Sequence, residues 1–153
     1  MTHNVKTLEP EQLMEPLLEL LEETEAVPLV ISGSSMTPFL VHGRDTVFLS
    51  KPVFPLKRGD MVLYRRDTGA YILHRVYRCE AAAYTMLGDN QTEPEPGIRP
   101  EQIRAVVTAV RRKGKLLKKG SFWWDFFERV WIRMVPLRPG VRAAYSCLKR
   151  VIH

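Results

Sequence analysis

The chain has 153 residues, of which 45% are hydrophobic and 26% are charged, and a formal net charge of +6. This length is enough for one domain with a hydrophobic core, and the composition excludes a disordered or fibrous chain. Its two cysteines form no C-x-x-C motif, so the sequence predicts neither a disulfide framework nor a metal site.

The sequence also predicts where the protein works. Residues 1–25 lack the basic start and the apolar core of a signal peptide. No run of about 18 uncharged apolar residues occurs, so no transmembrane helix is expected. We therefore expect a cytoplasmic or peripheral membrane protein.

The N-terminal segment, residues 1–26, is acidic and is expected to form a helix. Residues 1–30 hold one lysine and seven glutamates, which give this part of the chain a charge of −6. Within residues 9–25, apolar positions recur at helical spacing: Leu13, Leu17, Leu20 and Leu21. Pro16 lies inside this pattern, so the helix either kinks or begins there. We interpret it as a helix packed on its own domain; the alternative is a helix that binds a partner.

Residues 27–118 have the pattern of a β-rich domain. Strand-like runs occur at 27–31, 45–50, 60–65, 71–78, 83–87 and 103–110, and the last is expected to turn at 111–115 into a strand over 115–118. Segments rich in glycine, aspartate and proline separate the runs, as at 92–100. Strands that follow one another without helices between them indicate a mainly antiparallel, curled sheet. The predicted fold class is therefore mainly β, with helices at both ends (α+β).

The segment Gly33-Ser34-Ser35-Met36-Thr37-Pro38 places a serine in a turn between two apolar runs. Glycine before the serine permits a backbone conformation that is strained for other residues, and Pro38 stiffens the exit. A serine held in this way can present its hydroxyl while nearby backbone N–H groups point to a common site. Ser35 is therefore the candidate nucleophile, with its own N–H as an oxyanion donor.

A serine nucleophile needs a base, and His74 is the best candidate. A neutral imidazole can accept a proton and return it at physiological pH. His42 is the rival base, but its His-Gly-Arg-Asp turn is typical of an exposed loop. A carboxylate would orient the imidazole and stabilise its protonated form, and Asp89 is the first choice for this role. The alternative is that Asp89 holds its turn structurally.

Four short motifs occur in order: G-x-S-M-x-P at 33–38, G-D-x-V at 59–62, H-R-V at 74–76 and G-D-N at 88–90. Together they make a stronger signal than any one of them. Over residues 27–110 the chain resembles the superfamily of serine peptidases that contains signal peptidase I and the self-cleaving SOS-repressor proteases (S24/S26 type). The H-R-V motif is similar to that of the endoplasmic-reticulum and archaeal signal peptidases, which use histidine where most bacterial enzymes use lysine.

The resemblance implies a coiled β-fold and a peptide substrate that is extended, carries small residues near the scissile bond and pairs with a strand edge. It implies that Gly33 and Met36 belong to the substrate site, although core packing is the alternative for Met36. It also makes Glu95 an alternative to Asp89, because Glu95 falls where the histidine-type enzymes carry an aspartate. Gly59 and Asp60 are expected to shape a turn without a catalytic role.

The C-terminal segment, residues 119–153, is predicted to be helical and basic. Ser121 can cap a helix whose apolar positions gather on one side: Trp123, Phe126, Phe127, Val130, Trp131 and Met134. A second helix is expected over 141–152, with Tyr145, Leu148 and Ile152 facing inward. Residues 111–153 hold twelve basic and two acidic residues, a charge of +10.

Aromatic side chains on one face, surrounded by lysine and arginine, are typical of a helix in a membrane interface. We therefore expect residues 111–153 to contact an anionic membrane surface; the alternative is a helical hairpin packed on the β-domain. No nucleic-acid partner is expected.

The sequence favours a serine endopeptidase that cleaves a leader or precursor peptide through Ser35 and His74, without a cofactor or metal. The alternative is a non-catalytic module on the same fold that binds peptides or docks on a membrane. A self-cleaving transcriptional regulator fits poorly, because no Ala-Gly or Cys-Gly bond is present for self-cleavage.

Overall fold

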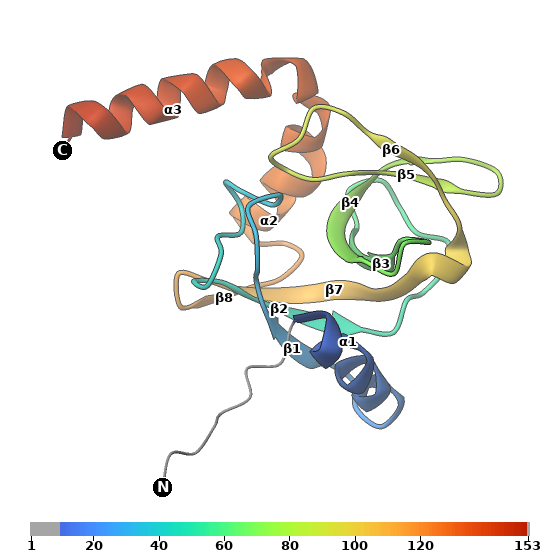
Figure 1. Cartoon of the computed structure of the whole chain (residues 1–153). Coiled ribbons are helices and arrows are strands. Elements are labelled where there is room, and N and C mark those ends of the chain that lie inside the picture. Colours follow the sequence, from blue (N-terminus) through green and yellow to red (C-terminus); the bar gives the residue numbers. More distant parts are fainter. Residues whose placement is uncertain (1–9, 153) are drawn as a thin grey trace, which may run out of the picture.

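The computed structural model describes residues 10–152, and within this range the chain forms a mainly β structure with helices at both ends (Figure 1). The strands are β1 (Val27–Val30), β2 (Thr46–Ser50), β3 (Met61–Arg65), β4 (Tyr71–Cys79), β5 (Tyr84–Leu87), β6 (Glu95–Ile98), β7 (Ile103–Arg112) and β8 (Lys115–Leu117). The α-helices are α1 (Pro10–Glu19), α2 (Phe122–Asp125) and α3 (Arg138–Ile152). Residues 1–9 of the acidic N-terminal segment lie outside the described part.

All strand pairs are antiparallel, and the sheet order is β1-β2-β7-β3-β4-β5-β6, with β8 paired to β7. Strand β7 is the longest and joins the two halves of the sheet, because it pairs with β2 on one side and β3 on the other. Within the described residues β1 and β6 end this strand order and do not pair with each other, so the sheet does not close into a barrel. The predicted antiparallel, mainly β fold class is confirmed.

The sequence missed one strand, β6, which lies in the segment predicted as a turn. Its sequence is Glu-Pro-Gly-Ile, and Gly97 has a positive φ of 77°. Proline has no N–H to donate and is tolerated in strands mainly at sheet edges, which is where β6 lies. The turn-like composition therefore hid an edge strand that carries Glu95.

Two hydrophobic clusters fill the structure. The first gathers side chains from α1, the β-sheet and the C-terminal segment, including Leu18, Leu63 and Trp131. The second lies around β3, β4 and β5 and includes Val62 and Tyr64. All three segments distinguished in the sequence, 1–26, 27–118 and 119–153, thus contribute to the first core from their described residues.

The N-terminal helix packs on the domain through a face that shares Leu17 and Leu21 with the predicted one. Met14, Leu18 and Leu21 are buried, whereas Leu13 and Leu20 are 48% and 49% exposed. Helix α1 runs through Pro16 and is followed by a 3₁₀ turn at Leu20–Glu22.

The C-terminal segment is partly core and partly exposed. After α2 the chain continues through a π-helical stretch, Phe126–Val130, and a 3₁₀ turn, Trp131–Arg133. Trp124, Phe127 and Trp131 are buried in this region. Phe122 is 72% exposed and Trp123 is 46% exposed. Two of the aromatic residues expected at a membrane, Phe127 and Trp131, therefore belong to the core.

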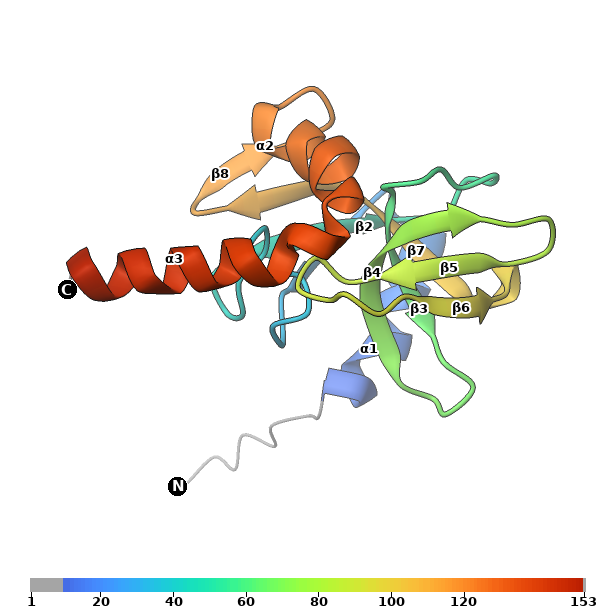
Figure 2. The same ribbon diagram turned by 90° about the horizontal axis from the view of Figure 1, so that it is seen from above.

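Helix α3 differs from its prediction in its start and in its surroundings. It begins at Arg138, with Pro139 in the first turn, where a missing N–H costs nothing. Tyr145 and Leu148 are 58% and 60% exposed, so the prediction that they face inward is wrong. In both views α3 passes the loop between β1 and β2 and its C-terminal half extends away from the sheet (Figure 2). Among residues 10–152, no helix combines the length and the apolar character needed to cross a bilayer.

Because one phenylalanine of the aromatic segment is buried and another is exposed, their replacement by alanine should have different effects on the free energy of unfolding. Phe127→Ala removes a ring that is 3% exposed and packs 4.8 Å from the ring of Phe39, measured between centroids. We expect the free energy of unfolding to fall by about 3–5 kcal/mol. Phe122→Ala, at an exposed position, is expected to change it by no more than about 0.5 kcal/mol. Urea denaturation of both variants measures the difference, and equal losses would contradict this placement of the segment.

Candidate active site

The serine turn is held by hydrogen bonds among its own residues. Gly33 adopts a φ of 82°, and its N–H donates to Nδ1 of His42 at 2.9 Å. The N–H and the hydroxyl of Thr37 both donate to the carbonyl of Ser34, at 3.2 and 2.8 Å. Ser35 is half-buried between these bonds. His42, the rival base in the sequence, thus accepts a backbone N–H of the turn and supports its shape.

His74 lies in the middle of β4, directly opposite Val62 of β3. Its side chain is buried, with 3% of the residue exposed. Burial disfavours the charged imidazolium and lowers the pKa of His74 to about 4. The imidazole is therefore neutral at physiological pH and can accept a proton.

Gly88 is the point at which the serine turn and the histidine meet. A Cβ atom at this position would lie 2.6 Å from the carbonyl oxygen of Ser35 and 3.0 Å from both Nε2 and Cδ2 of His74. No side chain fits there without moving its neighbours. Asn90, two residues later, donates its N–H to the same Ser35 carbonyl at 2.9 Å. Ser35 and the Nε2 edge of His74 are therefore neighbours across the Gly88 backbone.

The predicted pair is thus brought together, but without a direct bond. Among the described residues, no hydrogen bond joins Ser35 Oγ to His74. Catalytic hydrogen bonds are often long in the absence of substrate and tighten when it binds. The Ser35 N–H also forms no hydrogen bond within residues 10–152, which leaves it available to an oxyanion.

The far nitrogen of His74 faces a tyrosine rather than a carboxylate. Nδ1 lies 3.2 Å from the hydroxyl oxygen of Tyr64, which is fully buried. The same hydroxyl donates to Oε2 of Glu95 at 3.3 Å. Arg66 binds both oxygens of Glu95, with its closest contact at 2.6 Å. The residues form a chain from His74 through Tyr64 and Glu95 to Arg66.

This chain determines which imidazole nitrogen carries the proton. Its hydrogen bonds to Arg66 lower the pKa of Glu95, so the carboxylate is ionised and can only accept. Burial and the charge of Glu95 raise the pKa of Tyr64, which therefore keeps its proton and donates it to Glu95. The tyrosine oxygen must then accept from Nδ1–H of His74. Nε2, which lies beside Ser35, is left with a free lone pair, as a general base requires.

Asp89, the first-choice carboxylate, lies in a separate ion pair. Its Oδ1 accepts from Nε of Arg75 at 2.9 Å, and both side chains are essentially fully buried. Arg75 also donates to the carbonyl of Gly59 at 2.9 Å. Burial raises the pKa of Asp89, and the charges of Arg75 and Arg138 act in the opposite sense. Within the described residues no hydrogen bond connects Asp89 to His74, so the structure places Asp89 as a support of the loop.

The C-terminal segment holds the loop 88–91 from the side opposite Ser35. Trp131 donates its indole N–H to the carbonyl of Asp89 at 2.8 Å. Arg138, which is fully buried, donates to the carbonyls of Gly88 and Gln91 at 3.0 and 2.8 Å. These bonds fix the position of Gly88 against the serine and the histidine.

The two predicted substrate residues lie in different surroundings. Met36 is 2% exposed and is part of the first hydrophobic core, which is the packing alternative for this residue. Gly33 is exposed, and a Cβ there would meet no atom within 4 Å, although its positive φ would strain any other residue.

Sequence reasoning missed Tyr64 and Arg66, although a signal for the tyrosine is present. Strands β3 and β4 are joined by a short turn, and their register pairs Val62 with His74. Residues two apart on one strand share a face, so Tyr64 lies diagonally across from His74. To predict that Tyr64 is a neighbour of His74, the register of the β3–β4 hairpin must be known.

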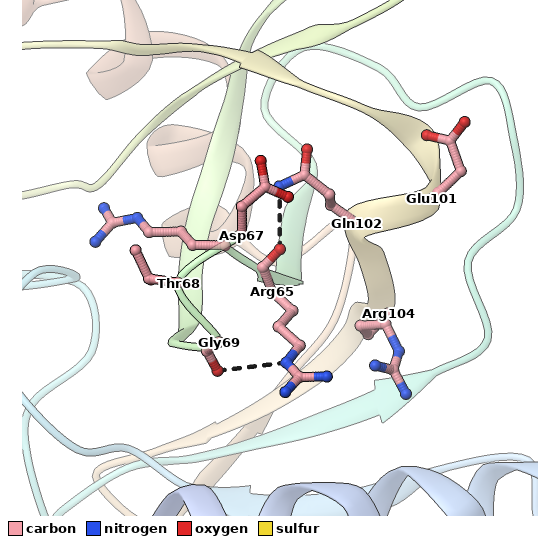
Figure 3. A pocket seen from close by; sticks show the side chains of 8 residues that line it. Arg65, Asp67, Thr68, Gly69, Glu101, Gln102 and Arg104 are labelled. Atoms are coloured by element: carbon pink, nitrogen blue, oxygen red, sulfur yellow. Dashed lines mark hydrogen bonds between the residues drawn. The ribbon is translucent and has the colours of Figure 1, made fainter.

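A polar hollow of about 480 Å³ lies next to the turn between β3 and β4, and Arg66 is among the residues that line it (Figure 3). Its lining includes Arg65, Asp67, Glu101 and Arg104, and it does not include Ser35 or His74. Arg104 is paired with Glu15 at 3.1 Å, and Asp67 is paired with Arg99 at 2.9 Å. The hollow is thus separate from the serine and histidine. Among residues 10–152, no cluster of three or more histidine, cysteine, aspartate or glutamate side chains is placed to hold a metal ion.

Comparison with protein families gives one match that covers more than half of the chain: the model described as Peptidase S24-like matches residues 4–110. This range contains the serine turn, β3, β4 and the loop 88–91. Comparison with curated proteins and comparison with solved structures each gave no match.

The lowered pKa of His74 predicts a specific pH dependence of stability. Between about pH 6.5 and pH 4 the unfolded chain binds a proton at this histidine and the folded chain does not, so folding becomes weaker as the pH falls. His74→Gln removes this contribution. The loss of unfolding free energy between pH 7 and pH 4.5 is expected to be smaller in the variant by about 2 kcal/mol. Urea titrations at both pH values measure it; an unchanged loss would mean that His74 is not buried in its neutral form.

Proposed function

This chain belongs to the Peptidase S24-like family, and on that premise we propose that it is a serine endopeptidase of the signal-peptidase type that cleaves a leader or precursor peptide. One observation carries the proposal: the Ser35 carbonyl and Nε2 of His74 both lie within 3.0 Å of the position that a Gly88 Cβ would occupy. The residues proposed as nucleophile and base are thus neighbours within the part of the chain that matches the peptidase family.

In the proposed reaction, Nε2 of His74 takes the proton of the Ser35 hydroxyl while Oγ attacks the carbonyl carbon of the scissile peptide bond. The free N–H of Ser35 donates to the oxyanion that forms. The imidazolium then gives its proton to the leaving amine, and an acyl-enzyme ester remains. Water, activated by the same imidazole, hydrolyses the ester and restores Ser35.

The buried chain behind His74 supports this cycle. Tyr64 fixes the imidazole in the tautomer that leaves Nε2 free, because its oxygen accepts from Nδ1–H. The negative charge of Glu95 favours the imidazolium and partly offsets the effect of burial on His74. Tyr64 and Glu95 are therefore positioning residues that act through the histidine. In this proposal they take the part that a carboxylate plays in a serine triad.

Replacement of the catalytic pair tests the proposal. Ser35→Ala and His74→Ala are each expected to reduce hydrolysis of a peptide with small residues at the scissile bond to a similar low floor, because the two act as one unit. Ser34→Ala is the matched control, since this adjacent serine is exposed, and it should retain activity. Near-normal activity of His74→Ala would move the base elsewhere, with His42→Gln as the next variant.

The same assay yields the pKa of the base. The acid limb of the kcat/KM profile reports the pKa of the base in the free enzyme, so it is expected near pH 4 rather than near pH 6.5. An acid limb near pH 6.5 in the enzyme that carries His74 would contradict a base whose pKa is lowered by burial. A folded enzyme without detectable peptide cleavage across a peptide library would favour the non-catalytic alternative.

Tyr64→Phe separates positioning from packing, because it removes only the hydroxyl. We expect kcat to fall by roughly 10- to 100-fold with little change in KM, and the acid limb of the rate profile to shift. Glu95→Gln should act in the same direction, and the double variant should lose less than the sum of the single losses. Losses that add independently, with an unchanged pH profile, would show that the two residues do not act through His74.

Asp89→Asn provides the contrast. It leaves Arg75 buried without its counter-charge, so the free energy of unfolding is expected to fall by about 3–5 kcal/mol. At a temperature where the variant remains folded, its acid limb should match that of the unmodified enzyme. A shifted limb with unchanged stability would instead assign the orienting role to Asp89.

A further inference from the structure

Helix α3 carries an apolar stripe that no part of the described chain covers. Val141, Tyr145, Leu148 and Val151 are 41%, 58%, 60% and 83% exposed. Their spacing of four, three and three residues places them along one face of the helix. Residues in this pattern are normally buried in a core, and both views show α3 standing apart from the sheet (Figures 1 and 2).

The charged residues of α3 are all basic: Lys149 and Arg150 are exposed, whereas Arg142 is half-buried and bonded to Asn90 and Arg138 is buried. From residue 129 to residue 153 the sequence holds six basic residues and no acidic one: Arg129, Arg133, Arg138, Arg142, Lys149 and Arg150. On α3, Arg142 and Lys149 lie next to the apolar stripe at helical spacing. Lys149 places its Nζ 5.5 Å from the ring centre of Tyr145.

The base of α3 is rigidly attached beside the proposed active site. Arg138 is fully buried and bonds to the loop 88–91. One turn later, Arg142 donates to both the carbonyl and the side-chain oxygen of Asn90, at 3.0 and 2.6 Å. Asn90 in turn bonds to the Ser35 carbonyl. A surface to which α3 binds would therefore lie at a fixed position relative to Ser35.

We propose that α3 lies in the interface of an anionic membrane, with its apolar stripe among the acyl chains and its cations at the headgroups. A helix with one apolar stripe, a polar remainder and basic residues beside the stripe has the composition that such binding requires. Anionic lipids attract each exposed lysine and arginine near the surface, and tyrosine suits the boundary between apolar and polar layers. The contact surface is thus α3 rather than the aromatic helix, whose Phe127 and Trp131 are in the core.

The charges favour a membrane over a second copy of the chain. Pairing α3 with α3 would bring two sets of like charges together. Pairing α3 with the acidic α1 of another copy would compete with bonds that α1 already makes, since Glu15 binds Arg104 at 3.1 Å from both of its oxygens. The proposal does not depend on the peptidase chemistry, because exposure and charge alone carry it.

Sedimentation of the full chain with vesicles tests the proposal. We expect binding to phosphatidylcholine vesicles that contain phosphatidylserine, little binding to phosphatidylcholine alone, and weaker binding as salt is added. Tyr145→Glu combined with Leu148→Glu should weaken binding roughly tenfold or more, and Lys149→Glu combined with Arg150→Glu should do the same. Leu13→Glu together with Leu20→Glu is the matched control, because these α1 leucines are exposed to a similar degree.

Circular dichroism and thermal melting confirm that each variant folds. Peptide hydrolysis in solution without lipid should be equal in the α3 variants and the unmodified protein, so failure of the peptidase proposal and failure of the membrane proposal are distinguishable. Absence of binding to anionic vesicles by the folded chain would overturn the proposal. So would self-association that the α3 variants abolish, without any lipid dependence.

Discussion

The close approach of the Gly88 backbone to two other residues is the constraint on which the proposed site depends. Its Cα carries no side chain, and only for this reason can the Ser35 carbonyl and the His74 ring lie against it. The loop that carries Gly88 must be held in place for this contact. Trp131 and Arg138 hold it by donating hydrogen bonds to carbonyl groups of the loop. The C-terminal segment lies beyond the residues matched by the family, yet it holds the loop against which Ser35 and His74 lie.

Burial of His74 has two opposing effects. It keeps the imidazole neutral at neutral pH, the form in which the proposed base can accept a proton, but a lowered pKa also makes the imidazole a weaker proton acceptor. The ionised Glu95, one hydroxyl group away, acts against the second effect by favouring the imidazolium. Arg66 keeps that carboxylate ionised. The proposed site thus combines a buried neutral imidazole with a nearby negative charge that would stabilise its protonated form.

Much of this could be predicted from the sequence, because the β-domain has regular patterns. Alternating and apolar runs predict the positions of most strands, and the two candidate residues that the motifs single out, Ser35 and His74, are neighbours in the structure. The orienting group was not predictable in the same way. Asp89 follows Gly88 directly in the sequence, but its partner Arg75 is set by packing across the sheet. To predict the role of Tyr64, the register of β3 and β4 must be known. To predict the position of Glu95, a strand that proline and glycine hide must be recognised.

The exposure of α3 also could not be predicted, because an amphipathic pattern does not specify what covers its apolar face.

The central claim is that His74 is a buried neutral imidazole with its proton on Nδ1 and its Nε2 lone pair beside Ser35. Nitrogen and proton NMR of the ¹⁵N-labelled histidine side chains reports both properties directly, with His74→Gln used for assignment. The account predicts the Nδ1–H tautomer at pH 7, no protonation of His74 down to about pH 5, and a change of tautomer population in Tyr64→Phe. An Nε2–H tautomer in the unmodified protein, or titration of His74 near its ordinary pKa of 6.5, would contradict it.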